Sequence, residues 1–232
     1  MPTNASLEEL NSRITQCNLC PRLRAHCMEI ARVRRRAYAE WEYWGKPVPS
    51  FGDPRARVLA LGLAPGAHGS NRTGRPFTGD GSGDFLYPVL HQAGFASQPR
   101  AVSRQDGMKL RGLWITSVAR CAPPGNKPTP AELRNCAPWF DREMALLKNL
   151  RVVVCLGRIA FDGLLSYLRR ARVKDMPPRS AFVFAHGAEY VLPNGLSAIT
   201  SFHPSLQNTN TGRLTAEMLL GVFARARQLA GL

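Results

Sequence analysis

The chain has 232 residues, with 31 Lys and Arg against 16 Asp and Glu, and its formal net charge is +15. Apolar residues make up 44% of it, which is too many for a disordered chain, and no apolar run approaches the roughly 20 residues of a membrane-spanning helix. The N-terminal residues MPTNASLEELNSR lack the apolar segment of a secretory signal, so we expect a cytoplasmic protein with a single domain over residues 1–232.

The excess positive charge is mostly arginine and forms two clusters, RVRRR at residues 32–36 and RRAR at residues 169–172. Arginine pairs well with phosphate because its guanidinium donates two parallel hydrogen bonds. The charge therefore favours a nucleic-acid partner, with a merely solvated basic surface as the alternative. A membrane surface is disfavoured, because no clean apolar stripe accompanies the first cluster.

The N-terminal part is predicted to be helical, over Ser6–Gln16 and Pro21–Glu40. The following segment, Trp41–Pro54, is rich in Pro, Gly and aromatic residues and is predicted to be a connector. We therefore expect residues 1–54 to form an N-terminal helical extension of the domain.

The rest of the chain alternates short apolar runs with helical stretches, a pattern typical of a layered α/β fold. Four runs are predicted as strands: Arg57–Leu63, Leu113–Val118, Arg151–Leu156 and Ser197–Ser201. Most are continuously apolar, as parallel strands buried on both faces should be. Helices are predicted over Asp84–Ala93, Ala131–Asn149, Ile159–Arg172 and Leu214–Leu229, and a small hairpin over Ala181–Phe184 and Glu189–Leu192. Thr129 and Glu132 match a capping box at the start of the second helix.

Six cysteines occur in a chain without an export signal, so disulfides are not expected. Four of them are candidate metal ligands: Cys17, Cys20, Cys121 and Cys136. Two thiolates separated by two residues can face one metal, and a distant pair completes a set of four. Zinc and an iron–sulfur cluster both take four thiolates, and the spacing does not choose between them. We expect Cys27 and Cys155 to be packed rather than ligating.

Polar loops rich in Gly or Pro follow three of the predicted strands, at residues 62–80, 119–128 and 202–208. Ligands bind outside the carboxyl ends of parallel strands, so these loops are predicted to form one site. The first loop is long for a strand–helix connection, and the backbone N–H groups of Gly66 and Ala67 could point at a ligand. It is not a P-loop, because no Gly-Lys-Ser/Thr follows.

The first loop, G-L-A-P-G-A-H-G-S-N-R-T-G-R-P-F-T-G-D, closely resembles motif one of the family 5 (type B) uracil-DNA glycosylases. Phe202-His203-Pro204-Ser205 resembles the second motif of that superfamily, and the spacing of the four candidate cysteines resembles the iron–sulfur site of families 4 and 5. Family 4 carries an acidic residue where this chain has Leu63, which favours family 5.

The resemblance implies a three-layer α/β/α fold around a central four-stranded parallel sheet. It also implies a structural [4Fe-4S] cluster on Cys17, Cys20, Cys121 and Cys136, which would tie the N-terminal extension to the loop after the second strand. Zinc in the same thiolates is the alternative.

The activity implied is that of a monofunctional DNA glycosylase, which flips uracil out of DNA and excises it by hydrolysis in base excision repair. Family 5 also implies action on other bases such as hypoxanthine and ethenocytosine. The alternatives are a family 4-like enzyme limited to uracil and a non-catalytic nucleic-acid-binding module stapled by zinc. The expected partner is DNA that contains uracil or deaminated bases, and no membrane association is expected. The protein is expected to be a monomer and to be associated with the nucleoid.

Three residues are candidates for the chemistry, which must stabilise a sugar cation and a departing base anion. Asp80, the only acid of the first loop, is expected to activate water, with a helix N-cap as its alternative role. His203 is expected to donate a hydrogen bond to O2 of the leaving uracil. Asn126 would contact the base edge or hold the water, or else only form a turn.

Further residues are candidates for binding. Base contacts are expected from Gly66, Ala67, His68 and Phe77, the last as a stacking platform unless it is simply core. The gap left by the flipped nucleotide is expected to be filled from Ser205, Leu206 and Gln207, with Leu206 as the apolar wedge. Phosphate contacts are expected from Arg72, Arg75, Lys127 and Arg213.

Overall fold

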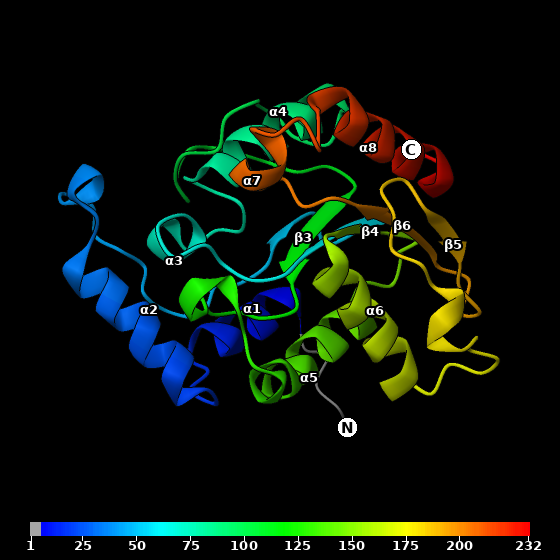
Figure 1. Ribbon diagram of the computed structural model, residues 1–232, viewed down its shortest axis with the longest axis horizontal. Helices are drawn as coiled ribbons and strands as arrows, with labels where there is room; N and C mark the ends of the chain where they lie inside the picture. The colour runs from blue at the N-terminus through cyan, green and yellow to red at the C-terminus, as the bar shows by residue number, and fades with distance from the viewer. Residues whose placement is uncertain (1–5) are drawn as a thin grey trace.

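A six-stranded sheet in the order β1-β3-β2-β4-β6-β5 runs through the middle of the computed structural model, which describes residues 6–232 (Figure 1). The strands are β1 (Phe51–Gly52), β2 (Val58–Gly62), β3 (Leu113–Ser117), β4 (Val152–Leu156), β5 (Glu189–Val191) and β6 (Ser197–Ser201). The central four are parallel, and β1 and β5 pair antiparallel at the two edges. The four predicted strands are confirmed, and two short edge strands widen the sheet.

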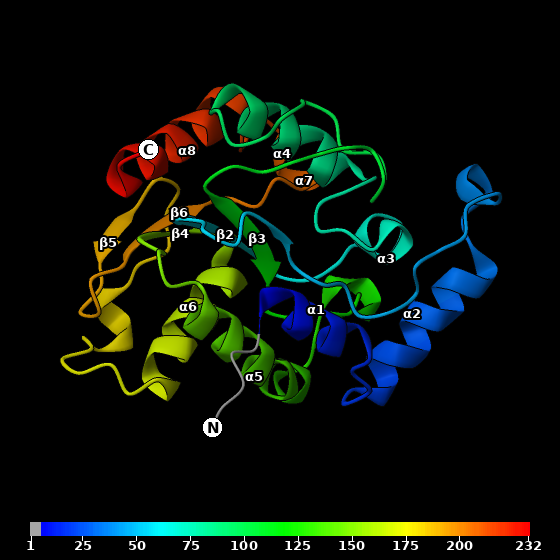
Figure 2. The same cartoon turned by 180° about the vertical axis from the view of Figure 1, so that it is seen from behind.

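Helices cover both faces of the sheet (Figures 1 and 2). One face carries α4 (Gly81–Gln92) and α8 (Ala216–Ala230), and the other carries α1 (Leu7–Thr15), α5 (Pro130–Leu146) and α6 (Arg158–Arg170). Alternate residues of β2 enter different apolar clusters, Val58 and Ala60 on the first face and Leu59 and Leu61 on the second. This double burial explains why the strand is apolar at every position. Within residues 6–232, no helix is long and apolar enough to cross a membrane.

The N-terminal extension contains α2 (Pro21–Val33), which projects from the body of the molecule, and a short 3-10 turn, η1 (Arg36–Tyr38). The helix ends at Val33 rather than at the predicted Glu40, because Arg34 has a left-handed φ of 58°. The extension meets the domain where α1 packs on α5 and α2 on α3 (Ser70–Thr73). Its first five residues lie outside the described part of the chain.

The start of α5 is as predicted. Thr129 Oγ1 accepts a hydrogen bond from Glu132 N (3.2 Å), and Glu132 Oε2 accepts one from Thr129 N (2.7 Å). Glu132 also pairs with Arg22 of α2 at 2.7 Å. The capping box is therefore confirmed, and its carboxylate has a second task of linking α5 to the extension.

The predicted hairpin is wrong. Ala181–Phe184 is not a strand, and β5 pairs with β6 instead. Phe182 is buried and its ring lies 6.3 Å from that of Phe161 on α6. Packing against the helix thus holds this segment, which follows the short turn η3 (Arg179–Ala181).

Candidate active site

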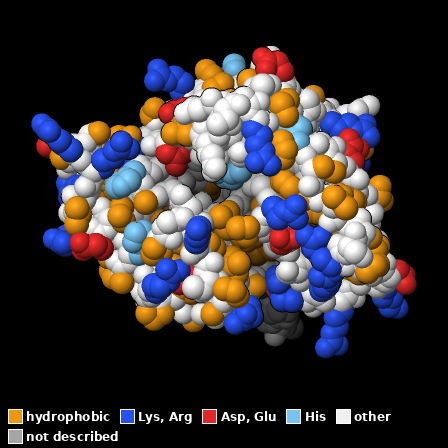
Figure 3. All heavy atoms as spheres, viewed as in Figure 1, with side chains coloured by type: hydrophobic (Ala, Val, Ile, Leu, Met, Phe, Trp, Pro, Cys, Tyr) orange, Lys and Arg blue, Asp and Glu red, His pale blue; other side chains and the backbone are white. Residues whose placement is uncertain are grey.

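A cavity of about 720 Å³ lies at the carboxyl ends of the parallel strands. Its walls come from the loops after β2, β3 and β6, the same three loops that the sequence singles out. The candidate residues that border it are Gly66, Ala67, His68, Phe77, Asp80, Asn126, His203, Ser205, Leu206 and Gln207. In Figure 3 the face that contains it is hollowed at the centre, with Lys and Arg side chains around the hollow. An opening bordered by positive charge suits a polyanion.

Asp80 uses its two carboxylate oxygens differently. Oδ1 accepts hydrogen bonds from the backbone N–H groups of Ser82 and Gly83, both at 3.1 Å, and so caps α4. Oδ2 accepts no hydrogen bond from the described residues and lies against Gly66 and Gly69, where a Cβ atom would stand 2.7 and 1.8 Å from it. Only glycine at both positions lets the carboxylate stand there. Capping and reaction with a ligand are therefore compatible.

The electrostatic setting of Asp80 favours a base. Burial raises its pKa, and the hydrogen bonds from the α4 N-terminus and the charge of Arg72 oppose that rise. A carboxylate with a raised pKa accepts a proton more readily than a fully solvated one, which is what activation of water requires.

His203, at the end of β6, lies beside Phe77, with ring centroids 5.8 Å apart and planes tilted by 33°. Burial lowers the pKa of His203 to about 4, so its imidazole is neutral at neutral pH and keeps one N–H donor. Phe77 has a φ of 49°, and its ring lies over Gly62, where a Cβ atom would come within 2.9 Å of it. The ring borders the cavity and also packs on the core, so both expectations for Phe77 describe its position.

The orientation of His68 depends on a residue that the sequence analysis did not identify. Tyr43 Oη lies 3.1 Å from His68 Nδ1 and accepts a hydrogen bond from Arg35 N at 3.4 Å. Tyr43, in the N-terminal extension, thus holds the His68 ring in place at the cavity wall through its Nδ1 atom.

Leu206 and Asn126 stand at the rim of the cavity. Leu206 begins α7 (Leu206–Thr209), is 56% exposed, and covers Gly81 so closely that a Cβ atom there would lie 2.6 Å from its Cδ2. Asn126 ends the 3-10 turn η2 (Pro124–Asn126) and is exposed, with a φ of 58°. Both side chains can meet a ligand that approaches from outside.

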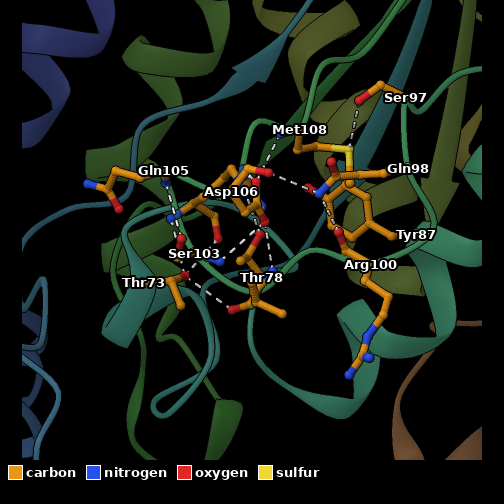
Figure 4. A network of polar contacts seen from close by, with 12 residues as sticks. Thr73, Thr78, Tyr87, Ser97, Gln98, Arg100, Ser103, Gln105, Asp106 and Met108 are labelled. Atoms are coloured by element: carbon orange, nitrogen blue, oxygen red, sulfur yellow. Dashed lines mark hydrogen bonds and ion pairs between the residues drawn. The ribbon is translucent and has the colours of Figure 1, made fainter.

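Two of the four residues expected to contact phosphate, Arg72 and Arg75, are not placed to do so, which corrects the expectation for them. Arg75 is buried and forms two hydrogen bonds to the carboxylate of Asp106, at 2.8 and 2.6 Å. Figure 4 shows the polar network around Asp106. Arg72 is also buried, and donates to backbone carbonyls of its own loop. Lys127 and Arg213 are exposed and free of ion pairs within the described residues.

The four candidate cysteines border a second, small cavity, between the start of α2, the loop after β3, and α5. Three of their sulfurs accept N–H groups: Cys17 from Trp139 (3.4 Å), Cys20 from Asn135 (3.8 Å) and Cys136 from the Arg120 backbone (3.3 Å). Burial raises the pKa of Cys20, and that of Cys136 to about 12. Metal binding here would have to displace the thiol protons.

Cys27 and Cys155 are buried, as expected of packed residues. Cys27 nevertheless lies against Cys121, in a cluster with Leu23 and Ala122. Among the described residues, no three His, Cys, Asp or Glu side chains converge on a point that a single ion could occupy. Arg24 borders the same cavity, and its buried Nη1 has no hydrogen-bond partner within residues 6–232.

Comparison with known proteins identifies the family to which the chain is similar. The sequence model of the uracil DNA glycosylase superfamily matches residues 49–227. The chain is 54% identical to the type-5 uracil-DNA glycosylase of Thermus thermophilus over 94% of this chain and 96% of that protein. It is 42% identical to the type-5 enzyme of Pyrobaculum aerophilum, over 97% and 93% of the two chains. A type-4 uracil-DNA glycosylase of Sulfurisphaera tokodaii is 26% identical, over 97% and 85%.

Proposed function

Because the chain belongs to the type-5 members of the uracil DNA glycosylase superfamily and excises uracil from DNA, we propose that Asp80, Asn126 and His203 carry the reaction in the cavity at the strand ends. The observation that supports this most directly is the position of Asp80, a lining residue of the cavity whose Oδ2 lies against Gly66 and Gly69 of the same wall, while Oδ1 caps α4.

In the proposed reaction the uracil nucleotide leaves the helix and its base enters the cavity, where the Phe77 ring stacks on it. As the glycosidic bond breaks and the base leaves as an anion, the charge of Asp80 stabilises the sugar cation. Asp80 also orients a water molecule and accepts its proton as the water oxygen bonds to C1′ of the sugar. The neutral His203 donates a hydrogen bond to the oxygen on which negative charge develops. Asn126, at the rim, holds the base edge or the water. The products are the free base and an abasic site, because among the described residues no lysine lines the cavity for lyase chemistry.

We further propose that the enzyme is a monomer that acts on nucleoid DNA and also releases hypoxanthine and ethenocytosine. Leu63 borders the cavity where family 4 carries an acid, so this wall is apolar and tolerates different base edges. The test is release of each base from a labelled duplex with one lesion. We expect release of uracil and of at least one other base. Release of uracil alone would support the narrower alternative.

Leu206 is proposed to fill the space that the flipped nucleotide vacates, because it is an exposed apolar side chain at the rim. We expect Leu206→Ala to slow uracil release from duplex DNA by roughly tenfold, the cost of about one lost apolar contact, with a smaller effect on single strands. Val191→Ala, at an 86% exposed apolar residue on β5 outside the cavity wall, is the matched control. An equal loss on both substrates would contradict the wedge.

We propose that Cys17, Cys20, Cys121 and Cys136 hold a structural [4Fe-4S] cluster. The donor set fits: four sulfurs spread around one cavity suit a cluster with one thiolate per iron. The unpartnered Nη1 of Arg24 supplies a positive charge at the same cavity. When bound, the cluster would cross-link α2, the loop after β3, and α5, while hydrolysis itself needs no electron.

Metal analysis of protein purified without air tests this assignment. We expect iron, with visible absorption, in the wild type and in Cys155→Ala, whose thiol is buried in β4. We expect loss of iron and a lower thermal unfolding temperature in Cys20→Ser. Zinc without iron in the wild type, or full iron in Cys20→Ser, would reject the cluster on these ligands.

A further inference from the structure

Arg72 lies in the loop that forms the site, yet it is buried, with only 4% of its surface exposed. Its Nε donates to the carbonyl of His68 at 2.7 Å and its Nη2 to the carbonyl of Gly79 at 2.6 Å. His68 lies in the first half of the loop of residues 62–80, and Gly79 directly precedes Asp80 at its end. One guanidinium therefore closes the loop on itself.

The rest of the guanidinium is covered by aromatic rings from the N-terminal extension. Its Cζ lies 3.8 Å from the ring centroid of Tyr38 and 4.1 Å from that of Trp41. Within residues 6–232, no carboxylate lies within ion-pair distance of Arg72. The two rings thus stabilise a buried cation that has no acidic partner.

The loop that Arg72 closes determines where the carboxylate of Asp80 stands. Gly79 precedes Asp80 directly, and the carbonyl of His68 belongs to the same turn as Gly66 and Gly69, against which Oδ2 lies. A side chain at Gly79 would meet Arg72 Nη2 at 2.5 Å, so the guanidinium is fitted closely to this segment. If Arg72 no longer linked the carbonyls of His68 and Gly79, the cavity wall at residues 66–69 and the Asp80 carboxylate could move independently.

We propose that Arg72 is a positioning residue, which bridges His68 and Gly79 and so sets the place of the Asp80 carboxylate, and that the rings of Tyr38 and Trp41 hold its guanidinium in that bridge. This deepens the proposed function and rests on the role proposed for Asp80. It also gives residues 38–41 of the N-terminal extension a role in positioning the site, which is separate from the structural role proposed for the cysteines.

The charge of Arg72 supplies a readout that a purely structural role would not move. The charged groups that act on Asp80 are Arg72 from α3, which lowers its pKa, and Asp84 from α4, which raises it, while His203 in the same cavity is neutral. Loss of the Arg72 charge therefore raises the pKa of Asp80. The reactive form is the carboxylate, so the acid limb of the rate–pH profile moves to higher pH.

The test compares single-turnover uracil release at saturating enzyme, DNA affinity and thermal unfolding for five variants. We expect Arg72→Met to slow release by about 10²-fold, as small misplacements of a catalytic group do, and to shift the acid limb upward. Arg72→Lys keeps the positive charge, so the acid limb of its rate–pH profile should return to the wild-type position. Only part of the rate should return, because an ammonium group cannot bridge two carbonyl groups as the planar guanidinium does. Trp41→Ala, at a partly exposed ring, should slow release by about tenfold with unchanged DNA affinity.

Arg104→Met is the matched control, because Arg104 is an exposed arginine over the ring of Trp44, at 4.3 Å, and does not border the cavity. It should behave as wild type. A folded Arg72→Met with the wild-type rate and pH profile would overturn the proposal. So would a Trp41→Ala that weakens DNA binding and leaves the rate intact, and this second variant decides if Arg72→Met does not fold. Wild-type rates in Asp80→Asn would instead refute the role of Asp80 itself.

Discussion

Asp80→Asn is expected to lower the single-turnover rate of uracil release by about 10²–10⁴-fold, the usual contribution of a general base, while the thermal unfolding temperature stays near that of the wild type. The asparagine oxygen can still accept the N–H groups of Ser82 and Gly83 that Oδ1 accepts, so the cap of α4 survives. The atom lost is Oδ2, the oxygen that does not cap α4 and lies against Gly66 and Gly69 of the cavity wall. Rate and stability therefore separate in this variant.

Asp80→Ala is the companion variant, because it removes both oxygens. Its rate of uracil release should fall by the same factor as that of Asp80→Asn. In addition, its unfolding free energy should fall by about 1 kcal/mol, the usual contribution of an N-cap. If Asp80→Asn kept the wild-type rate and only Asp80→Ala were impaired, the carboxylate would be a cap and not a base.

The pH dependence of the wild type follows from the same carboxylate. Burial raises the pKa of Asp80, so protonation removes the base at a higher pH than it would for a solvent-exposed aspartate. His203, with a pKa of about 4, is neutral at neutral pH and gains a proton only near pH 4. The fall of the rate above that pH should therefore report on Asp80, and should be absent from the residual activity of Asp80→Asn.

Glu143→Ala is expected to cost about 3–5 kcal/mol of unfolding free energy, the range for a buried ion pair that loses one partner. Glu143 is fully buried on α5 and accepts hydrogen bonds from Trp114 Nε1 (2.9 Å), Thr116 Oγ1 (2.6 Å) and Arg120 Nη2 (2.6 Å). Without the carboxylate, Trp114 Nε1 and Arg120 Nη2 lose their acceptor and the buried guanidinium loses its counter-charge, while Thr116 Oγ1 keeps only its contact with Ser50 Oγ (2.8 Å). Urea unfolding with fluorescence detection measures the loss.

The same helix provides the control. Asp141 pairs with Arg170 of α6 at a site where both side chains are about a third or more exposed. Asp141→Ala should therefore cost no more than about 1 kcal/mol. The double variant Arg120→Met with Glu143→Leu should recover much of the loss, because it leaves no unpaired charge. A loss below 1 kcal/mol in Glu143→Ala would contradict the argument.

The sequence alone determines the layered α/β fold and the loops that line the candidate site. Val58–Gly62 and Val152–Leu156 are short, continuously apolar runs, and such runs are stable as strands only when helices cover both faces. The sequence also predicts the capping box of α5, because Thr129 and its partner Glu132 are only three residues apart. The loops that follow the strands carry Asp80 and His203, and parallel strands bring their carboxyl ends to one edge.

What only the tertiary structure decides is the partner of each long polar side chain. The sequence around an arginine in a polar loop does not show which group its guanidinium contacts. Arg75 is predicted to contact a DNA phosphate, and in the structure it pairs with Asp106. The same holds for Arg72, whose rings come from Tyr38 and Trp41 in a segment that the sequence assigns to a helix and a connector. Strands and caps depend on neighbours in the chain and on burial, which leave a periodic pattern. Ion pairs and cation–π contacts join distant segments through side chains that reach several ångströms, and no pattern in the sequence records which ones meet.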